Sequence, residues 1–135
     1  MSRSLSFEVA LDASFSEAVE QVVAALKKEG FGVLTRIEIH EAFKEKLGID
    51  FRPYTILGAC NPPLAHRALS AAPEAGLLLP CNVTVEEREG GGAIVRIANP
   101  EEMMKAGDFS QDEAVSAVGR EAYDRLRRVA EALSA

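Results

Sequence analysis

The sequence predicts an α+β fold, in which a mostly antiparallel sheet is backed on one face by two long helices. Five short segments have the apolar–polar alternation of strands, and two longer segments near the ends of the chain repeat apolar residues at helical spacing. Gly90-Gly91-Gly92 lies between the last two strand segments and predicts a hairpin turn. The predicted order is β-α-β-α-β-α-β-β-α-α, within a single domain that spans residues 1–135.

The two long helices have clear start signals. Ser14 and Glu17 form a capping box that opens the first helix, and Gly30 is placed to end it in the left-handed conformation. Ser110 and Glu113 form a second capping box, which opens a helix that runs toward the end of the sequence. Each helix carries one apolar stripe, so both are expected to pack on the same face of the sheet.

The strands are predicted from their alternation. Val33, Thr35 and Ile37 are expected to share one face of the second strand, and Leu77 is expected to open the fourth and longest one. Pro53 removes one hydrogen-bond donor near the start of the third strand, which places that start at an edge or a bulge. The five strands are expected at residues 5–11, 33–39, 51–60, 77–87 and 93–98.

Short helices are predicted between the strands and before the last helix. One spans residues 41–47 and ends at Gly48. Asn61-Pro62 and Asn99-Pro100 each combine an N-cap residue with a proline at the first helical position, so each predicts a helix start.

Charge and composition exclude several classes of function. The net charge is −6 and the sequence pI is near 5.0, whereas binding to a phosphate backbone needs clustered lysine and arginine. No apolar run approaches the ~20 residues of a membrane span, and the first residues lack the apolar stretch of a signal peptide. We therefore expect a soluble, cytoplasmic protein that binds neither nucleic acid nor membranes and keeps its two cysteines reduced.

Two Cys-Asn segments are the candidates for chemistry. Cys60 directly precedes the helix start at Asn61, where backbone N–H groups can lower the pKa of a thiol, so it is a candidate nucleophile, persulfide carrier or soft-metal ligand. Cys81 lies on an apolar strand face and could join Cys60 in binding a soft cation or forming a disulfide. Ordinary packing also explains each cysteine, and it is the favoured interpretation for both. Because no third ligand or CxxC spacing accompanies them, we expect no metal site and no cofactor.

Three further polar residues lie near these cysteines in the predicted strands. Asn82 sits in mid-strand, where it either hydrogen-bonds the Asn61 turn or lines a pocket. Arg52 and Tyr54 alternate onto the strand face of Cys60 and could present hydrogen-bonding groups to an anionic ligand. The alternative for that face is an exposed or intersubunit surface.

Two histidines and two methionines complete the candidates. His66 lies one turn into the helix after Cys60 and could act as a base toward the thiol, although a surface position is the simpler interpretation. His40 begins a short helix and is expected to be solvated. Met103 and Met104 are interpreted as core side chains rather than copper ligands.

Several segments closely resemble the prokaryotic family known as domain of unknown function 302: residues 15–33, 51–62, 76–83 and 99–104. The resemblance covers about residues 5–133. It implies an α+β fold grouped with the TATA-binding-protein-like arrangement, with a β-α-β(4)-α core, a curved antiparallel sheet backed by helices, and short inserted helices. It also implies assembly as a homodimer. It carries over no catalytic residues, because the family has no established activity, and a shared fold does not imply DNA binding.

Three functions fit these observations. The favoured one is a small binding or sensing module, with a small-molecule pocket between sheet and helices. The alternatives are a thiol-based redox or sulfur-transfer enzyme that uses Cys60, and a structural homodimer joined through the exposed sheet face. The residues expected to line the pocket are Arg52, Tyr54, Cys60, Asn61, Cys81 and Asn82.

Overall fold

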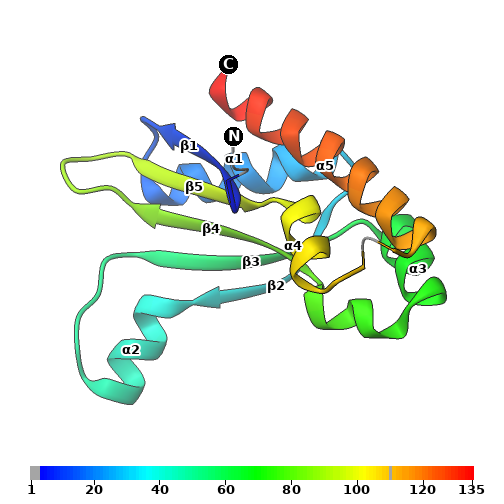
Figure 1. The fold of residues 1–135 in the computed structure, drawn as a ribbon. Coiled ribbons are helices and arrows are strands. Elements are labelled where there is room, and N and C mark those ends of the chain that lie inside the picture. The colour runs from blue at the N-terminus through cyan, green and yellow to red at the C-terminus, as the bar shows by residue number, and fades with distance from the viewer. Residues whose placement is uncertain (1–3, 110) are drawn as a thin grey trace.

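The computed structural model of the chain describes residues 4–109 and 111–135. Five strands form one curved sheet in the order β1-β5-β4-β3-β2, and every neighbouring pair is antiparallel (Figure 1). The predicted α+β class and the predicted order of strands and α-helices are confirmed. The strands are β1 (Ser6–Leu11), β2 (Gly32–Glu38), β3 (Tyr54–Cys60), β4 (Cys81–Glu87) and β5 (Ala93–Ala98).

The two long helices, α1 (Phe15–Lys28) and α5 (Glu113–Ser134), lie side by side on one face of the sheet, as predicted (Figure 1). Their apolar stripes and the inward-facing strand residues form the core. Full burial of one such aliphatic side chain stabilises the fold by roughly 1.5–3 kcal/mol relative to leaving it exposed. The largest fully buried side chains include Val22 and Leu26 from α1, Leu126 and Val129 from α5, and Leu57, Val83, Val85, Val95 and Ile97 from the sheet.

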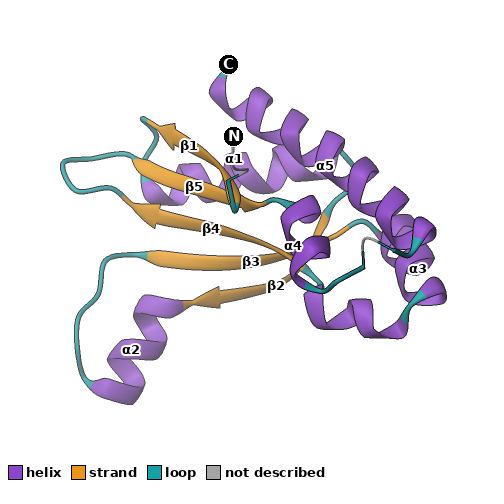
Figure 2. Ribbon diagram, in the orientation of Figure 1, coloured by secondary structure: helices purple, strands orange, loops and turns teal. Residues whose placement is uncertain are grey.

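The shorter helices gather at the two ends of the sheet (Figure 2). Helix α2 (Ile39–Leu47) continues from β2 at the end where β3 begins. At the opposite end, where β3 stops and β4 starts, lie α3 (Pro62–Ala71), the 3₁₀ helix η1 (Pro73–Leu78) and α4 (Pro100–Ala106). Both α3 and α4 pack against α5, so this end of the sheet is enclosed by helices.

The signals that bound α1 act as predicted. The Ser14 hydroxyl accepts a hydrogen bond from the Glu17 backbone N–H at 3.2 Å. At the other end, Gly30 adopts a φ of +86°, and the N–H groups of Gly30 and Phe31 donate to the carbonyls of Lys27 and Leu26. This is the Schellman arrangement, which satisfies carbonyl groups that the helix itself leaves free.

The fourth strand is shorter than the sequence prediction. Residues 77 and 78 belong to η1, and β4 begins only at Cys81. Two prolines explain the difference: Pro73 sets the φ of a helical start, and Pro80 has no N–H to donate to a strand ladder. As a result Leu77, predicted to face the core, is 87% exposed.

Three smaller predictions also change. A bulge between Val33 and Thr35 shifts the register of β2, so that Val33 partners Ala59 while Thr35 partners Gly58, and the two side chains lie on opposite faces. The third strand begins at Tyr54 rather than residue 51, directly after Pro53. The predicted cap at Ser110 lies outside the described residues; α5 is capped by the Asp112 carboxylate, which accepts from the Val115 N–H at 3.1 Å.

The sheet face opposite α1 and α5 carries charged and apolar side chains together. Ile37 on this face is 48% exposed.

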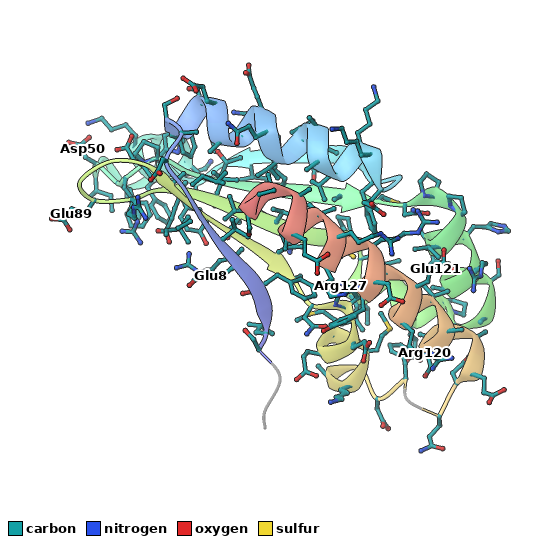
Figure 3. All side chains as sticks on the ribbon, turned by 90° about the horizontal axis from the view of Figure 1, so that it is seen from above. Glu8, Asp50, Glu89, Arg120, Glu121 and Arg127 are labelled. Atoms are coloured by element: carbon teal, nitrogen blue, oxygen red, sulfur yellow. The ribbon has the colours of Figure 1, made fainter. Side chains whose placement is uncertain are left out.

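Charged side chains also project from the helices, as Glu121 and Arg127 do from α5 (Figure 3). Glu121 pairs with Arg67 of α3 at 3.1 Å. Across the part of the chain that the structure describes, no helix has the length and apolar character to cross a membrane.

Candidate functional site

Cys60 and Cys81 line the same cavity at the helix-covered end of the sheet. Cys60 is the last residue of β3 and Cys81 the first of β4, and the strand register pairs Cys81 with Ala59, the neighbour of Cys60. The cavity has a volume of about 30 Å³. It therefore has room for one or two water-sized groups as it stands.

The wall of this cavity is almost wholly apolar and is built largely from small side chains. Alanines from β3, α3, η1 and α5 contribute, together with Gly119 of α5. The thioether of Met104 from α4 lies in the same wall as the two thiols. The alanines are Ala59, Ala65, Ala68, Ala75 and Ala122.

Asn61 is the polar residue of the wall, and its side chain links the start of α3 to the end of α1. The Asn61 Oδ1 caps α3 by accepting from the Leu64 N–H at 3.2 Å, which confirms its predicted role. Its Nδ2 donates to the Glu29 carbonyl, 3.4 Å away, at the end of α1. Arg125 of α5 donates to that same carbonyl at 3.0 Å. The amide that borders the cavity is thus already engaged and holds the cavity wall in place.

The two thiols are free and each is half-buried. Burial raises the pKa of the Cys81 thiol to about 11, and the nearby Cys60 adds to this increase. At neutral pH only about one molecule in ten thousand would carry a Cys81 thiolate. Cys81 therefore contributes a neutral, soft surface to the cavity.

A second cavity of about 60 Å³ adjoins the first. Cys81 and Met104 line both cavities, and Asn82 and Met103 line the second. Asn82 is an exposed residue at the edge of this second cavity, and the Asn61 amide bonds to Leu64 and Glu29. The methionines, interpreted from the sequence as core side chains, lie in cavity walls.

Arg52 and Tyr54 do not lie with the cysteines. Tyr54 begins β3 and Cys60 ends it, so roughly 20 Å of strand separates the two ends. The guanidinium of Arg52 pairs with the carboxylate of Glu86 at 2.6 Å. Glu86 also pairs with Arg96, which reaches Glu8 at 2.8 Å, so a ladder of four charges crosses the open sheet face. The arginine predicted to meet an anionic ligand is therefore held by a carboxylate of the chain itself.

The sequence matches the family described as domain of unknown function DUF302 over residues 7–133. The chain belongs to the DUF302 family. A crystal structure of an uncharacterised conserved DUF302 protein from Bacillus stearothermophilus superimposes with a TM-score of 0.84 and 28% identity, covering 96% of this chain and 98% of that chain. No curated protein matches the sequence. The resemblance inferred from the sequence is confirmed, whereas the TATA-binding-protein-like arrangement and the homodimer stay predictions.

The histidines of this DUF302 chain differ from each other in their surroundings. His66 is exposed on α3 and does not contribute to the wall of the cysteine cavity, which fits the surface interpretation. His40, expected to be solvated, is half-buried instead. Its Nδ1 lies 3.0 Å from the Tyr54 backbone nitrogen, and its ring meets the Phe15 ring edge-on at 6.0 Å. The sequence prediction was wrong here because β3 and α1, distant along the chain, fold over the start of α2.

The sequence prediction also missed a group of possible metal ligands. Within residues 4–109 and 111–135, one set of three or more histidine, cysteine and carboxylate side chains has ligand atoms close enough to share an ion: Glu38, His40 and Glu41. The signal was present as Glu-Ile-His-Glu, but the prediction divided these residues between the end of the second strand and a solvated helix start. The cysteines of the DUF302 chain are not part of that set.

Proposed function

We propose that this DUF302 protein is a binding module that holds a compact, uncharged ligand in the cavity lined by Cys60 and Cys81. The observation that carries the proposal is the composition of the wall, in which two thiols and a thioether meet small apolar side chains at an end of the sheet enclosed by helices. If the two cysteines served only in core packing, we would expect larger side chains to fill this space.

The chemistry of the wall supports an uncharged ligand. No lysine, arginine, aspartate, glutamate or histidine of the described chain lines the cavity. A charged ligand would lose its hydration there without gaining a partner, at a cost of several kcal/mol. The Asn61 amide is occupied by its bonds to Leu64 and Glu29, so it offers little to a strongly polar ligand.

The size of the space supports a ligand of few atoms. Pockets for drug-sized molecules usually measure about 300–1,000 Å³. The two adjoining cavities here measure about 30 and 60 Å³. Met104 lies in the wall that they share, and because a methionine side chain changes rotamer readily, its movement would join the two spaces.

A matched pair of substitutions on α3 tests the proposal. Ala65→Leu adds three carbon atoms to a side chain that lines the cavity, whereas Ala71→Leu makes the same change at an exposed position of the same helix. Mass spectrometry of the intact chain under non-denaturing conditions would detect a bound small molecule. We expect a bound mass on the unsubstituted chain and on Ala71→Leu, and its loss on Ala65→Leu. A bound mass that persists on Ala65→Leu would place the ligand elsewhere.

The thiol enzyme and the homodimer stay predictions. The raised pKa of Cys81 speaks against a role as resolving nucleophile near neutral pH, because the thiolate is the reactive form. The homodimer would need a contact on the open sheet face, where Arg52, Arg96, Glu86 and Glu8 already pair within the chain. Size-exclusion chromatography with light scattering would determine the oligomeric state.

A further inference from the structure

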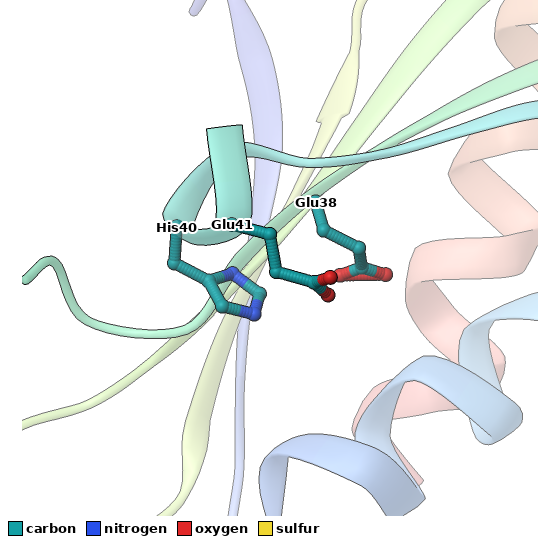
Figure 4. Close-up of side chains that lie close together, drawn as sticks. All are labelled: Glu38, His40 and Glu41. Atoms are coloured by element: carbon teal, nitrogen blue, oxygen red, sulfur yellow. The ribbon is translucent and has the colours of Figure 1, made fainter. Parts of the chain in front are cut away.

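We propose that Glu38, His40 and Glu41 form a binding site for a divalent first-row transition-metal ion such as Zn²⁺. Each residue offers one ligand atom, and the three atoms lie within 4.8 Å of one another. Figure 4 shows the three side chains converging on one space where β2 passes into α2. This site lies at the end of the sheet opposite the cysteine cavity, and it departs from the sequence expectation that the chain holds no metal.

The Glu38 carboxylate is fixed by its neighbours. The Thr55 hydroxyl donates to its Oε2 at 2.7 Å, and the Arg36 guanidinium donates to its Oε1. A carboxylate has about four lone-pair positions, so these two bonds leave room for a metal. These bonds hold the carboxylate beside the ligand atoms of His40 and Glu41, with which it lies within 4.8 Å.

The His40 ring is oriented for metal binding by the backbone of β3. Its Nδ1 accepts a hydrogen bond from the Tyr54 backbone N–H at 3.0 Å and also lies 3.2 Å from the Tyr54 carbonyl oxygen. Metal binding through Nε2 would exchange the first bond for one from Nδ1–H to that carbonyl, which is the usual arrangement of a metal-bound histidine. The Phe15 ring, 6.0 Å away and perpendicular, limits rotation of the imidazole.

The donor set favours a transition metal over calcium or magnesium. Imidazole nitrogen suits Zn²⁺ and its neighbours, whereas Ca²⁺ and Mg²⁺ prefer oxygen ligands alone. The N-terminus of α2 places roughly half a positive charge near the site, and the two negative charges of Glu38 and Glu41 outweigh it.

The site must contract to hold a metal. Bonds of about 2.1 Å bring tetrahedral ligands to about 3.4 Å from each other. Glu41 is exposed and free to move inward. Three protein ligands leave one position open for water or a further ligand.

Zinc titration of the full chain tests the site, with calorimetry and histidine NMR as independent readouts. Glu41→Gln removes one ligand charge at an exposed position, and Glu45→Gln makes the same change elsewhere on α2, at another exposed position. Cys60→Ser controls for zinc bound by thiols. The chain has two histidines, so His66, exposed on α3, serves as the internal reference for His40.

We expect one zinc ion per chain, a large shift of the His40 imidazole nitrogens and none at His66. Glu41→Gln should weaken binding at least tenfold, while Glu45→Gln and Cys60→Ser leave it unchanged. The proposal is overturned if zinc leaves the His40 resonances unmoved, if Glu45→Gln weakens binding as much as Glu41→Gln, or if Cys60→Ser abolishes it.

Discussion

Cys60 and Cys81 come from neighbouring antiparallel strands and face one cavity, yet no disulfide joins them. The register pairs Cys81 with Ala59, so the two cysteines are offset by one residue rather than directly opposed. Burial keeps Cys81 protonated. Cys81 therefore contributes a soft, neutral surface to the wall that the two thiols share, and this wall underlies the proposed binding function.

The reactivity of Cys81 should depend steeply on pH. Its pKa of about 11 means that alkylation by iodoacetamide at pH 8 is slower in the folded chain than in the unfolded chain by roughly two orders of magnitude. The rate in the folded chain should rise about tenfold per pH unit until the pH approaches 11. Peptide mapping by mass spectrometry follows Cys81 separately from Cys60. Equal rates at pH 8 with and without denaturant would contradict a buried, protonated Cys81.

Gly30 and Gly48 each end a helix in the left-handed backbone conformation, and they differ in the space available for a β-carbon. Both have positive φ, +86° and +66°. A β-carbon at Gly30 would lie 2.8 Å from the Asn61 Nδ2, whereas a β-carbon at Gly48 would meet nothing within 4 Å. We expect Gly48→Ala to cost about 1 kcal/mol from backbone strain, and Gly30→Ala to cost about 1–2 kcal/mol more. Urea denaturation measures both, and equal losses would show that the contact with Asn61 has no energetic weight.

Asn61 should stabilise the chain through both ends of its amide group. Asn61→Ala removes the cap of α3 and the bond to the Glu29 carbonyl, so we expect it to lower the free energy of unfolding by about 2 kcal/mol. Asn61→Ser keeps a hydroxyl that can cap α3 and should recover about half of that loss. The same urea titrations provide the values. A serine variant no more stable than the alanine variant would argue against the capping role.

Glu86 should make the stability of the protein sensitive to acid. Its hydrogen bond from Arg96 lowers the pKa of the carboxyl, and the bond from Arg52 adds to this, together outweighing the opposing effect of burial. A carboxyl with a lowered folded pKa stabilises the fold above its ordinary pKa of about 4.3, and this contribution is lost as the pH falls through the lowered value. Glu86→Gln should therefore lower the free energy of unfolding by about 1–2 kcal/mol at pH 7. The variant should also lose less of that free energy than the original chain as the pH falls below about 4.3.

The control for Glu86 lies in the same ladder of charges. Glu8 is exposed and, within the ladder, pairs with Arg96 alone, so Glu8→Gln should change the stability by less than about 0.5 kcal/mol at either pH. Thermal unfolding followed from pH 7 to pH 3 compares the two variants. A Glu86→Gln variant that loses stability with acid as steeply as the original chain would remove Glu86 from this account.

The sequence was sufficient to predict the fold where local signals act alone. The Ser14 cap, the Gly30 stop and the Asn61 cap all depend on residues close together in the chain, and each was found where it was predicted. The apolar stripes of α1 and α5 likewise predicted which face of each helix is buried. The predicted start of the fourth strand at Leu77 was wrong, because the apolar alternation there does not reflect the effect of Pro73 and Pro80 on the backbone.

The candidate site could be predicted only in part, because long-range contacts decide it. The two Cys-Asn segments led to Cys60, Asn61 and Cys81, which do line one cavity. The contribution of Met104 depends on how α4 packs against α5, which no local pattern encodes. Arg52 was placed in the same site by strand alternation alone, whereas its position at the far end of β3 and its bond to Glu86 follow from the register of the sheet.

The most direct test of the binding function is whether a small neutral probe enters the cysteine cavity. Xenon is suited to it, because its atoms occupy small apolar cavities without needing polar contacts. Methyl NMR under xenon pressure should show saturable shifts at Ala59, Ala68 and Ala122, unchanged in Ala71→Leu and abolished in Ala65→Leu. Methyl groups around Cys60 and Cys81 that do not respond to xenon in the unsubstituted chain would contradict a ligand-accessible cavity.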